Sequence, residues 1–195
     1  MTAEATSTAK ADLRREVRER RRARADAAPP GERHAQAALL ADALVAGLRR
    51  HVGPGVCRVA AYEARRTEPP TDVLVDRLTA LGYDVVVPVT LPDRDLDWRA
   101  AGAPDGMALG VETVASVAVV VVPALAVDLA GHRLGQGGGS YDRALPRRAA
   151  GALVVAMLHD DELLPAGTVP VDAHDVGVDA VVTPGRGWVS LSRGG

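Results

Sequence analysis

The sequence predicts an α/β protein with an open, mostly parallel sheet that is flanked by helices. Near-continuous runs of β-branched residues, of which 117–122 is the clearest, are typical of strands buried on both faces. Segments with apolar residues at the helical period alternate with these runs, which indicates βα units. A chain of 195 residues that is 47% hydrophobic can bury one core. We therefore expect a single domain over residues 10–195 with Rossmann-like layering.

The individual elements follow from the same patterns. Residues 1–9 are small and polar and are expected to be disordered, and an N-terminal helix runs from Lys10 to just before Pro29. Apolar spacing predicts a second helix over residues 31–51, closed by the glycine and proline residues at 53–55. The later elements are strands at 56–62, 85–89, 117–122, 152–158 and 179–183, and a helix at 71–81 with Thr71 as N-cap. Residues 91–98 break the alternation and predict an extra turn or hairpin over one end of the sheet.

A glycine-rich segment follows the strand at 117–122, in the place where parallel sheets bind their ligands. Four of the five residues 135–139 are glycine, so the backbone can adopt positive φ and approach a ligand closely. Successive amide groups in such turns bind anions. A short helix from residue 139 or 140 to 145, stopped or kinked by Pro146, adds first-turn donors to the same space.

Two charged side chains distinguish this segment from an ordinary mobile surface loop. Arg133 offers a rigid fork of donors that suits phosphate oxygens, and Asp142 can hold a hard cation beside them. The dinucleotide fingerprint and the P-loop do not fit, because Ser140 stands where a third glycine is needed and no Gly-Lys-Ser/Thr follows. The mobile loop remains the alternative to a phosphate site.

The N-terminal helix carries a second clue. All but one of the 23 basic side chains are arginine, and the exception is Lys10. An ammonium group at this position can reach a nucleotide as a point charge, with Arg14 one helical turn later on the same face. The alternative is chance retention of one lysine near a frayed terminus.

Composition excludes several classes of function. The net charge of -2 gives no general affinity for nucleic acid, and the arginines of the N-terminal helix are interleaved with acids, as on a solvated helix face. No apolar stretch is long enough to span a membrane or resembles a signal peptide, and a single cysteine, Cys57, fits a reducing cytosol. The five histidines lack zinc spacing, and no Gly-x-Ser-x-Gly elbow is present. We expect a cytoplasmic protein.

Residues 123–142 resemble the signature of the 5-formyltetrahydrofolate cyclo-ligase family, also called methenyltetrahydrofolate synthetase. The positions in register are Pro123, Asp128, Gly131, Arg133, Leu134, Gly135, Gly137, Gly139, Tyr141 and Asp142. Residues 10–14 are similar to the family's N-terminal Lys-x-x-Leu-Arg, and residues 169–183 resemble its closing segment. Four positions depart from the family pattern, namely Leu109, Thr113, Gln136 and Ser140.

The resemblance implies an ATP- and magnesium-dependent enzyme that cyclises 5-formyltetrahydrofolate to 5,10-methenyltetrahydrofolate and releases ADP and phosphate. It implies that Lys10 and Arg133 are catalytic, and that Asp142 and Asp179 bind Mg²⁺. The implied ATP-binding residues are Lys10, Arg14, Arg133, Leu134, Gly135, Gln136, Gly137, Gly138, Gly139, Ser140 and Tyr141. The implied folate-binding residues are Glu68, Gln136, Gly137, Gly138, Gly139 and Ser140.

The expected partners are therefore small-molecule substrates, ATP and a reduced formyl-folate, bound by a monomer without nucleic acid or membrane. Two alternatives stay open. The chain could be a nucleotide-binding relative that has lost folate turnover, since Leu109, Gln136 and Ser140 depart at folate contacts. It could also be a sugar-phosphate or CoA-ester enzyme on a similar sheet, which would give Lys10 no direct role.

Overall fold

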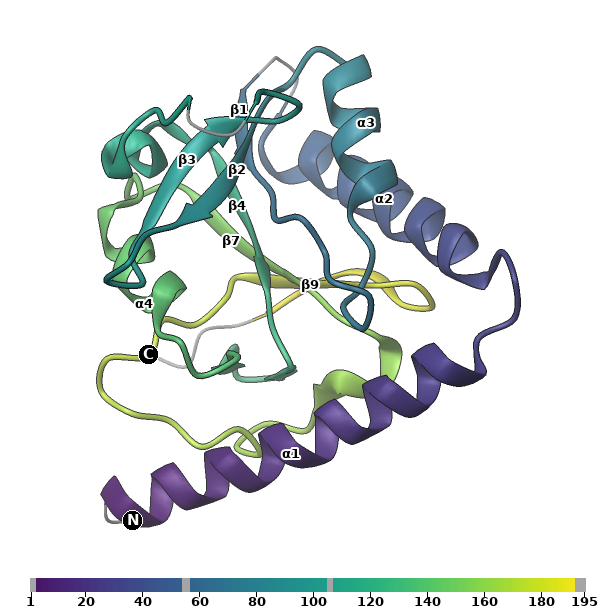
Figure 1. The fold of residues 1–195 in the computed structure, drawn as a ribbon, viewed down its shortest axis with the longest axis vertical. Coiled ribbons are helices and arrows are strands. Elements are labelled where there is room, and N and C mark those ends of the chain that lie inside the picture. The colour runs from purple at the N-terminus through teal and green to yellow at the C-terminus, as the bar shows by residue number, and fades with distance from the viewer. Residues whose placement is uncertain (1–2, 54–56, 105–106, 192–195) are drawn as a thin grey trace.

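The β-branched runs of the sequence assemble into one seven-stranded sheet (Figure 1). This computed structural model describes residues 3–53, 57–104 and 107–191. The strands, in their order across the sheet, are β10 (Gly187–Ser190), β9 (Ala180–Thr183), β7 (Leu153–Met157), β4 (Val119–Pro123), β1 (Arg58–Ala60), β2 (Asp84–Thr90) and β3 (Leu96–Ala100). The neighbours from β9 to β2 pair in parallel, and β3 and β10 pair antiparallel at the two edges. The predicted mostly parallel sheet is confirmed.

Helices cover one face of this sheet, and shorter turns cover the other (Figure 1). The helices α2 (Glu32–His51) and α3 (Asp72–Ala80) pack with Val119 and Val121 of β4 in one apolar cluster. Alternate residues of the same strand join the opposite cluster, together with buried residues of η1 (Val111–Ser116), α4 (Ser140–Ala144) and η2 (Leu145–Arg147). Burial on both faces explains why these strands read as continuous apolar runs.

Residues 91–95 form the turn of the β2–β3 hairpin and residues 96–98 begin β3, so the predicted interruption is an antiparallel edge of the sheet. Thr71 does stand at the N-cap of α3, but its hydroxyl makes no cap hydrogen bond to the helix. It donates to Tyr62 O at 2.5 Å and accepts from Ala64 N at 3.1 Å. Thr71 therefore braces the loop after β1. The proposed closing turn at 54–55 and the predicted strand start at residue 56 lie outside the described residues.

A second, three-stranded sheet was not predicted. It consists of β6 (Arg133–Leu134), β5 (Ala126–Asp128) and β8 (Leu163–Leu164), and η3 (Asp160–Glu162) precedes β8. Strands of two or three residues carry no periodic signal, so sequence patterns do not detect them. This small sheet holds the segment that leads into the glycine-rich loop.

The N-terminal helix α1 (Ala3–Ala27) lies along one side of the body (Figure 1). It begins at Ala3 and not near Lys10, so the expectation of disorder over residues 1–9 is wrong for residues 3–9. Alanine is the strongest helix former, and Thr6 in the second turn is buried, which holds this end in place. Across the described parts of the chain, no helix combines the length and the apolar character that crossing a membrane requires.

Strand order places a crevice at the carboxyl ends of β1 and β4. From β1 the chain proceeds to β2 on one side, and from β4 it proceeds to β7 on the other side. The segments that leave these two neighbouring strands therefore diverge. Open α/β sheets bind ligands at such a switch point.

Candidate active site

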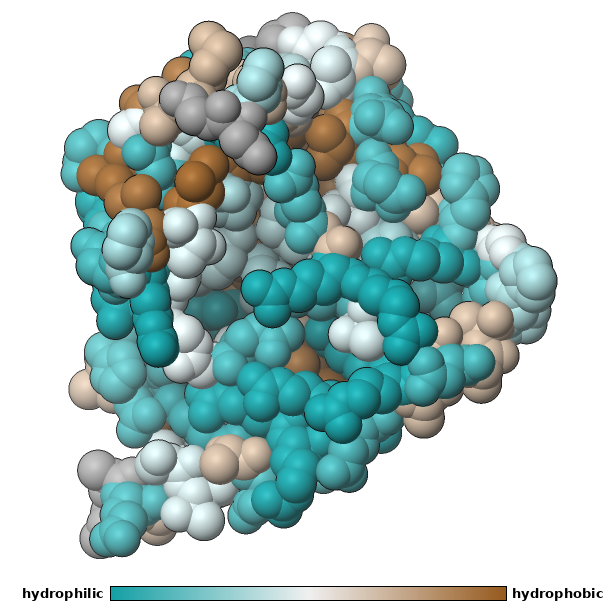
Figure 2. All heavy atoms as spheres, in the orientation of Figure 1, coloured by the Kyte–Doolittle hydropathy of each residue, from teal (hydrophilic) through white to brown (hydrophobic). Residues whose placement is uncertain are grey.

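A cavity of about 650 Å³ opens at this switch point. Its walls come from α1, from the loop after β1, from the β2–β3 hairpin, from the glycine-rich loop and from residues 172–175 before β9. The corresponding face is hollowed between α1 and the sheet, and mostly hydrophilic residues surround the hollow (Figure 2). Segments that are far apart in the sequence thus meet at one polar site.

The structure gathers most of the predicted site residues around this cavity. Those that line it are Lys10, Arg14, Glu68, Arg133, Gly135, Gln136, Gly137, Gly138, Gly139, Ser140, Tyr141 and Asp142. Two predicted residues, Leu134 and Asp179, are not part of its lining.

The turn before the glycine-rich loop is built on Asp128, whose side chain is fully buried. One of its carboxylate oxygens accepts from the backbone amides of Ala130 and His132, both at 3.0 Å. Gly131 in this turn has φ 86°, and a Cβ there would lie 2.8 Å from Val178 O. Only glycine fits this close approach, so Asp128 and Gly131 serve the turn that aims Arg133.

The loop itself adopts the backbone geometry that its glycines predict. Gly137 and Gly139 have φ 94° and 72°, and α4 starts directly afterwards at Ser140. The start of this helix agrees with the prediction, and its first residues Ser140, Tyr141 and Asp142 line the cavity.

Lys10 is the basic residue that α1 brings deepest into the site, with 5% exposure. Its Nζ donates to Asp172 Oδ2 at 2.7 Å and also contacts the carboxylate of Asp175. Burial alone would lower the pKa of Lys10, but its hydrogen bonds to the two carboxylates, together with their negative charges, outweigh this effect and raise the pKa above its usual value. The ammonium group therefore stays charged.

Arg14 lies one turn further along α1 and donates from Nε to Gly135 O at 3.0 Å. Burial lowers its pKa, and the neighbouring Arg18 adds to this effect, yet a guanidinium remains charged at neutral pH. Arg133 is also buried and pairs with the Asp142 carboxylate. Asp142 in turn accepts from Val176 N at 3.3 Å, which ties α4 to the segment before β9.

A different group of side chains lies at the loop after β1. Glu68 has 5% exposure, accepts from Arg65 N at 2.9 Å and accepts from Gln136 Nε2 at 3.3 Å. The Tyr141 hydroxyl is buried and has no hydrogen-bond partner among the described residues. Burial raises the pKa of Tyr141, so the hydroxyl keeps its proton and is available as a donor to a ligand.

The predicted metal pair of Asp142 and Asp179 is not brought together. Asp179 directly precedes β9 and accepts from Val154 N at 2.8 Å, at the opposite end of the strands from the cavity. The structure separates Asp179 from Asp142 because Asp179 lies on the amino-terminal side of its strand. The side chain of Leu134, a predicted ATP-binding residue, is buried in the apolar cluster that contains Val17.

Sequence reasoning missed the residues that supply carboxylates beside Asp142. Asp172, His174 and Asp175 line the cavity, and their ligand atoms lie within 4.8 Å of one another. Three potential ligands within four residues of a polar segment were a signal that could have been found. Oxygen donors of this kind suit Mg²⁺, so Asp142, Asp172 and Asp175 could hold it.

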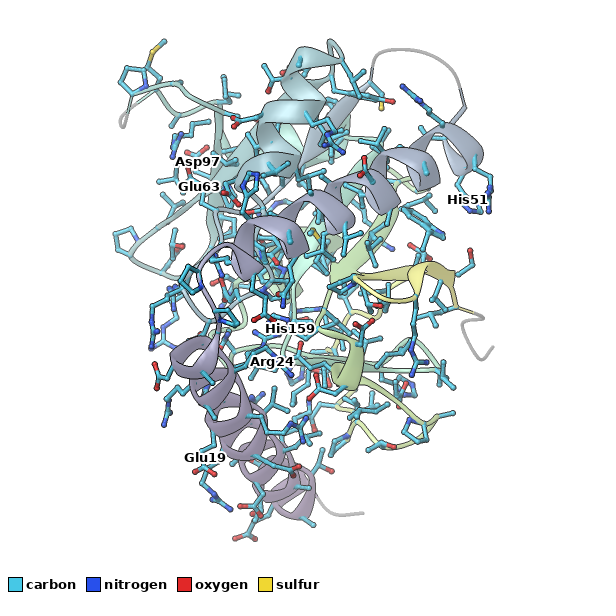
Figure 3. The ribbon with its side chains drawn as sticks, turned by 90° about the vertical axis from the view of Figure 1, so that its right-hand side faces the viewer. Glu19, Arg24, His51, Glu63, Asp97 and His159 are labelled. Carbon is cyan, nitrogen blue, oxygen red and sulfur yellow. The ribbon has the colours of Figure 1, made fainter. Side chains whose placement is uncertain are left out.

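A buried ion pair anchors α1 beside the cavity. Arg21 and Glu162 have 2% and 1% exposed side chains and share two contacts of 2.7 Å. Arg21 also donates to Ala124 O at 2.6 Å, next to the end of β4. Burial would lower the pKa of Arg21, but the hydrogen bonds to Glu162 raise it overall. Figure 3 shows Arg24 of α1 beside His159 at the same junction, and Glu19 pointing away from the body.

Comparison with known proteins relates almost the whole chain to one family. The model of the 5-formyltetrahydrofolate cyclo-ligase family matches residues 6–184. A 5-formyltetrahydrofolate cyclo-ligase from Mycolicibacterium smegmatis is 36% identical over 199 residues, which cover 93% of this chain and 97% of the relative. An Escherichia coli protein of the same name is 39% identical over 71 residues, which cover 36% of this chain and 38% of that one.

Solved structures share the fold. The 5,10-methenyltetrahydrofolate synthetase from Mycoplasma pneumoniae aligns with a TM-score of 0.70 at 20% identity, covering 88% of this chain and 96% of that one. The NMR structure of the Aquifex aeolicus 5,10-methenyltetrahydrofolate synthetase aligns with a TM-score of 0.69 at 24% identity, covering 95% and 94% of the two chains.

Proposed function

The chain belongs to the 5-formyltetrahydrofolate cyclo-ligase family, and we propose that it catalyses the ATP- and Mg²⁺-dependent cyclisation of 5-formyltetrahydrofolate to 5,10-methenyltetrahydrofolate. The observation that carries the proposal is the convergence of α1, the glycine-rich loop and Glu68 on one cavity. A volume of about 650 Å³ lies within the range of small-molecule sites.

The triphosphate would lie along the glycine-rich loop. Lys10, Arg14 and Arg133 supply positive charge from two sides of the cavity, and the loop amides supply further donors. Arg14 already holds the carbonyl of Gly135, so the helix and the loop form one rigid wall. This arrangement neutralises phosphate charge without a large rearrangement of the sheet.

The metal would be held by Asp142 and Asp175, with Asp172 close by. When bound, Mg²⁺ neutralises phosphate charge and orients the transferred group. Lys10 compensates the charges of Asp172 and Asp175. We propose that the Lys10 ammonium turns from these carboxylates toward the phosphate when the substrate and the metal arrive.

The folate would occupy the part of the cavity between Glu68 and Tyr141. The Glu68 carboxylate accepts hydrogen bonds from the pterin, and the free hydroxyl of Tyr141 can donate to a substrate oxygen. These two contacts would fix which folate nitrogen lies beside the reacting phosphate.

The formyl oxygen is a poor leaving group, so the reaction would proceed in two steps. The γ-phosphoryl group moves from ATP to the formyl oxygen, giving an imidoyl-type phosphate and ADP. The neighbouring folate nitrogen then attacks the same carbon, loses its proton and expels phosphate. Phosphoryl transfer requires mainly alignment and charge neutralisation, which Lys10, Arg14 and Arg133 would supply.

The direct experiment is to incubate the protein with MgCl₂, ATP and 5-formyltetrahydrofolate and to follow the near-ultraviolet band of the methenyl product. We expect the band to grow only when all three are present. A folded protein that binds ATP without forming this band would favour the nucleotide-binding alternative. A cytosolic location is part of the proposal and fits the single cysteine of the chain.

A further inference from the structure

Gln136 is the residue of the glycine-rich loop that reaches furthest toward the folate side of the cavity. Its side-chain amide nitrogen donates to Glu68 Oε1 at 3.3 Å. Its amide oxygen accepts from Arg18 of α1, from Nε at 3.3 Å and from a terminal nitrogen at 3.2 Å. A carboxylate must accept and a guanidinium must donate, so only one orientation of the amide satisfies both neighbours.

Arg18 also holds the backbone of the same residue. Its terminal nitrogen donates to Gln136 O at 2.7 Å, one residue beyond the contact of Arg14 with Gly135 O. Two successive carbonyls of the loop are therefore fixed by two successive turns of α1. Any ligand that orders α1 against the loop also orders the side chain of Gln136.

Glu68 has one carboxylate oxygen that depends on this contact. Its Oε2 is held by Arg65 N at 2.9 Å, and its backbone carbonyl accepts from Arg33 at 3.0 Å. The position of Oε1 is set by Gln136. We call the chain of contacts Arg18–Gln136–Glu68 the amide bridge.

We propose that Gln136, oriented by Arg18, is a positioning residue that couples the nucleotide site to the folate site and makes the binding of the two substrates cooperative. The inference rests on the proposed function. The amide bridge joins the loop that would hold ATP to the carboxylate that would hold the pterin, so a nucleotide that restrains the loop also restrains Glu68 and lowers the entropic cost of binding the folate. Linkage requires that the folate strengthen ATP binding by the same factor.

The test is the dissociation constant of 5-formyltetrahydrofolate, measured by calorimetry with and without a non-hydrolysable ATP analogue and MgCl₂. In the wild-type protein we expect the analogue to tighten folate binding about tenfold. In Gln136→Glu, the carboxylate still accepts from Arg18 but cannot donate to Glu68, so the factor should fall to within about twofold of one. The factor compares two folate dissociation constants of the same variant at saturating analogue, so a change in the binding of the analogue alone does not enter it.

A second variant removes the other arm of the bridge. Arg18→Lys keeps the charge but cannot contact the carbonyl and the amide oxygen together, so it should lose the coupling to the same extent. The double variant should lose no more than either single variant, because both act on one bridge.

The chain offers a matched control for each change. Gln36→Glu makes the same substitution beside another glutamate, since Gln36 Nε2 donates to Glu32 Oε1 at 3.1 Å in α2. Arg15→Lys changes an exposed arginine of α1 that pairs with Asp12. Both controls should keep the wild-type coupling factor.

The outcomes separate the two proposals. If the wild-type protein forms the methenyl product but its substrates bind independently, the amide bridge has no coupling role. The same conclusion follows if Gln136→Glu and Arg18→Lys retain the wild-type factor. If the wild-type protein forms no product from ATP and 5-formyltetrahydrofolate, the proposed function itself fails.

Discussion

Lys10 is the only lysine of the chain, and its ammonium group is paired with Asp172 and Asp175. Under the proposed function, this pairing would give one residue two tasks. The ammonium group compensates two carboxylates that share one cavity, and it would present its charge to phosphate when the nucleotide binds.

We predict that Lys10→Met weakens ATP use and strengthens metal binding. Loss of a charge-assisted contact should raise the KM for ATP about tenfold. Without the ammonium group, the carboxylates of Asp172 and Asp175 lose the positive charge that is paired with them. Mn²⁺ should therefore bind more tightly to the variant than to the wild-type protein when no nucleotide is added. Both effects are measurable, by steady-state kinetics and by titration with Mn²⁺. Weaker Mn²⁺ binding than in the wild-type protein would contradict the double role.

A second prediction concerns the two aspartates near the C-terminal strand. Asp175→Asn should raise the Mg²⁺ concentration required for half-maximal rate about tenfold, because Asp175 faces the cavity. Asp179→Asn should leave this concentration unchanged, since Asp179 contacts the backbone of Val154. Titration of both variants with Mg²⁺ compares them directly. An equal Mg²⁺ requirement in the two variants would contradict the assignment of Asp175 to the metal site.

The site residues were therefore predictable to different degrees. Lys10, Arg133 and the glycines could be identified because composition or spacing singles them out. The choice between Asp175 and Asp179 could not be made, because it depends on where β9 begins and hence on which end of the sheet each carboxylate occupies. Arg18 gave no signal, since it is one arginine among many on α1 and only the fold brings it to Gln136.

At the scale of elements, α1 is the part of the site that is attached least by apolar contacts. Val17 is fully buried against Leu125 and Leu134, but most other contacts of this helix with the body are polar. The pair of Arg21 with Glu162 is the buried one among them. It fixes the helix beside the end of β4, and so determines where Lys10 and Arg14 lie.

Breaking this pair should be far more costly than breaking an exposed one. We predict that Glu162→Gln lowers the free energy of unfolding by about 3 to 5 kcal/mol, because Arg21 is left charged and buried. Asp26→Asn, which removes an exposed pair between α1 and Arg66, should cost less than about 1 kcal/mol. Urea unfolding measures both. Equal losses in the two variants would contradict an anchoring role for Arg21.

The elements that sequence patterns predicted are those with long apolar runs. Each strand predicted from such a run is present, because a strand buried on both faces reads as an unbroken apolar run. The helices α2 and α3 are present as well, because burial of one helix face repeats apolar residues at the helical period. The strands β5, β6 and β8 were not predicted, because each has two or three residues and depends on partners distant in the sequence. The start of α1 was predicted too late in the sequence, because the composition of residues 3–9 suggested disorder. The burial of Thr6 against the body of the protein, which the sequence does not reveal, stabilises the helix there.

At the scale of the whole molecule, one buried histidine makes stability depend on pH. His159 follows β7 with 7% exposure and lies beside Arg24, Arg21 and Glu162 at the junction of α1 with the body (Figure 3). Burial lowers its pKa from the usual 6.5. The ring is neutral in both states above that pH, whereas below it only the unfolded chain takes up the proton.

The protein should therefore lose stability as the pH falls through the usual histidine pKa of 6.5, and the loss should continue until the folded protein also takes up the proton. His159→Gln has no titrating ring, so its urea midpoint should fall less as the pH is lowered. Midpoints at several pH values for both proteins provide the measurement. If the urea midpoints of the two proteins fall equally with pH, His159 is not the cause of the pH dependence.

The anchor at Arg21 also determines how precisely α1 must be placed. With a rise of 1.5 Å per residue, Lys10 lies roughly 16 Å from Arg21, so a tilt of about 10° at that point would move the ammonium end about 3 Å. The contacts of Arg14 and Arg18 with two carbonyls of the glycine-rich loop oppose such a tilt. Accuracy at the far end of a long helix is therefore secured at two separate points along its length.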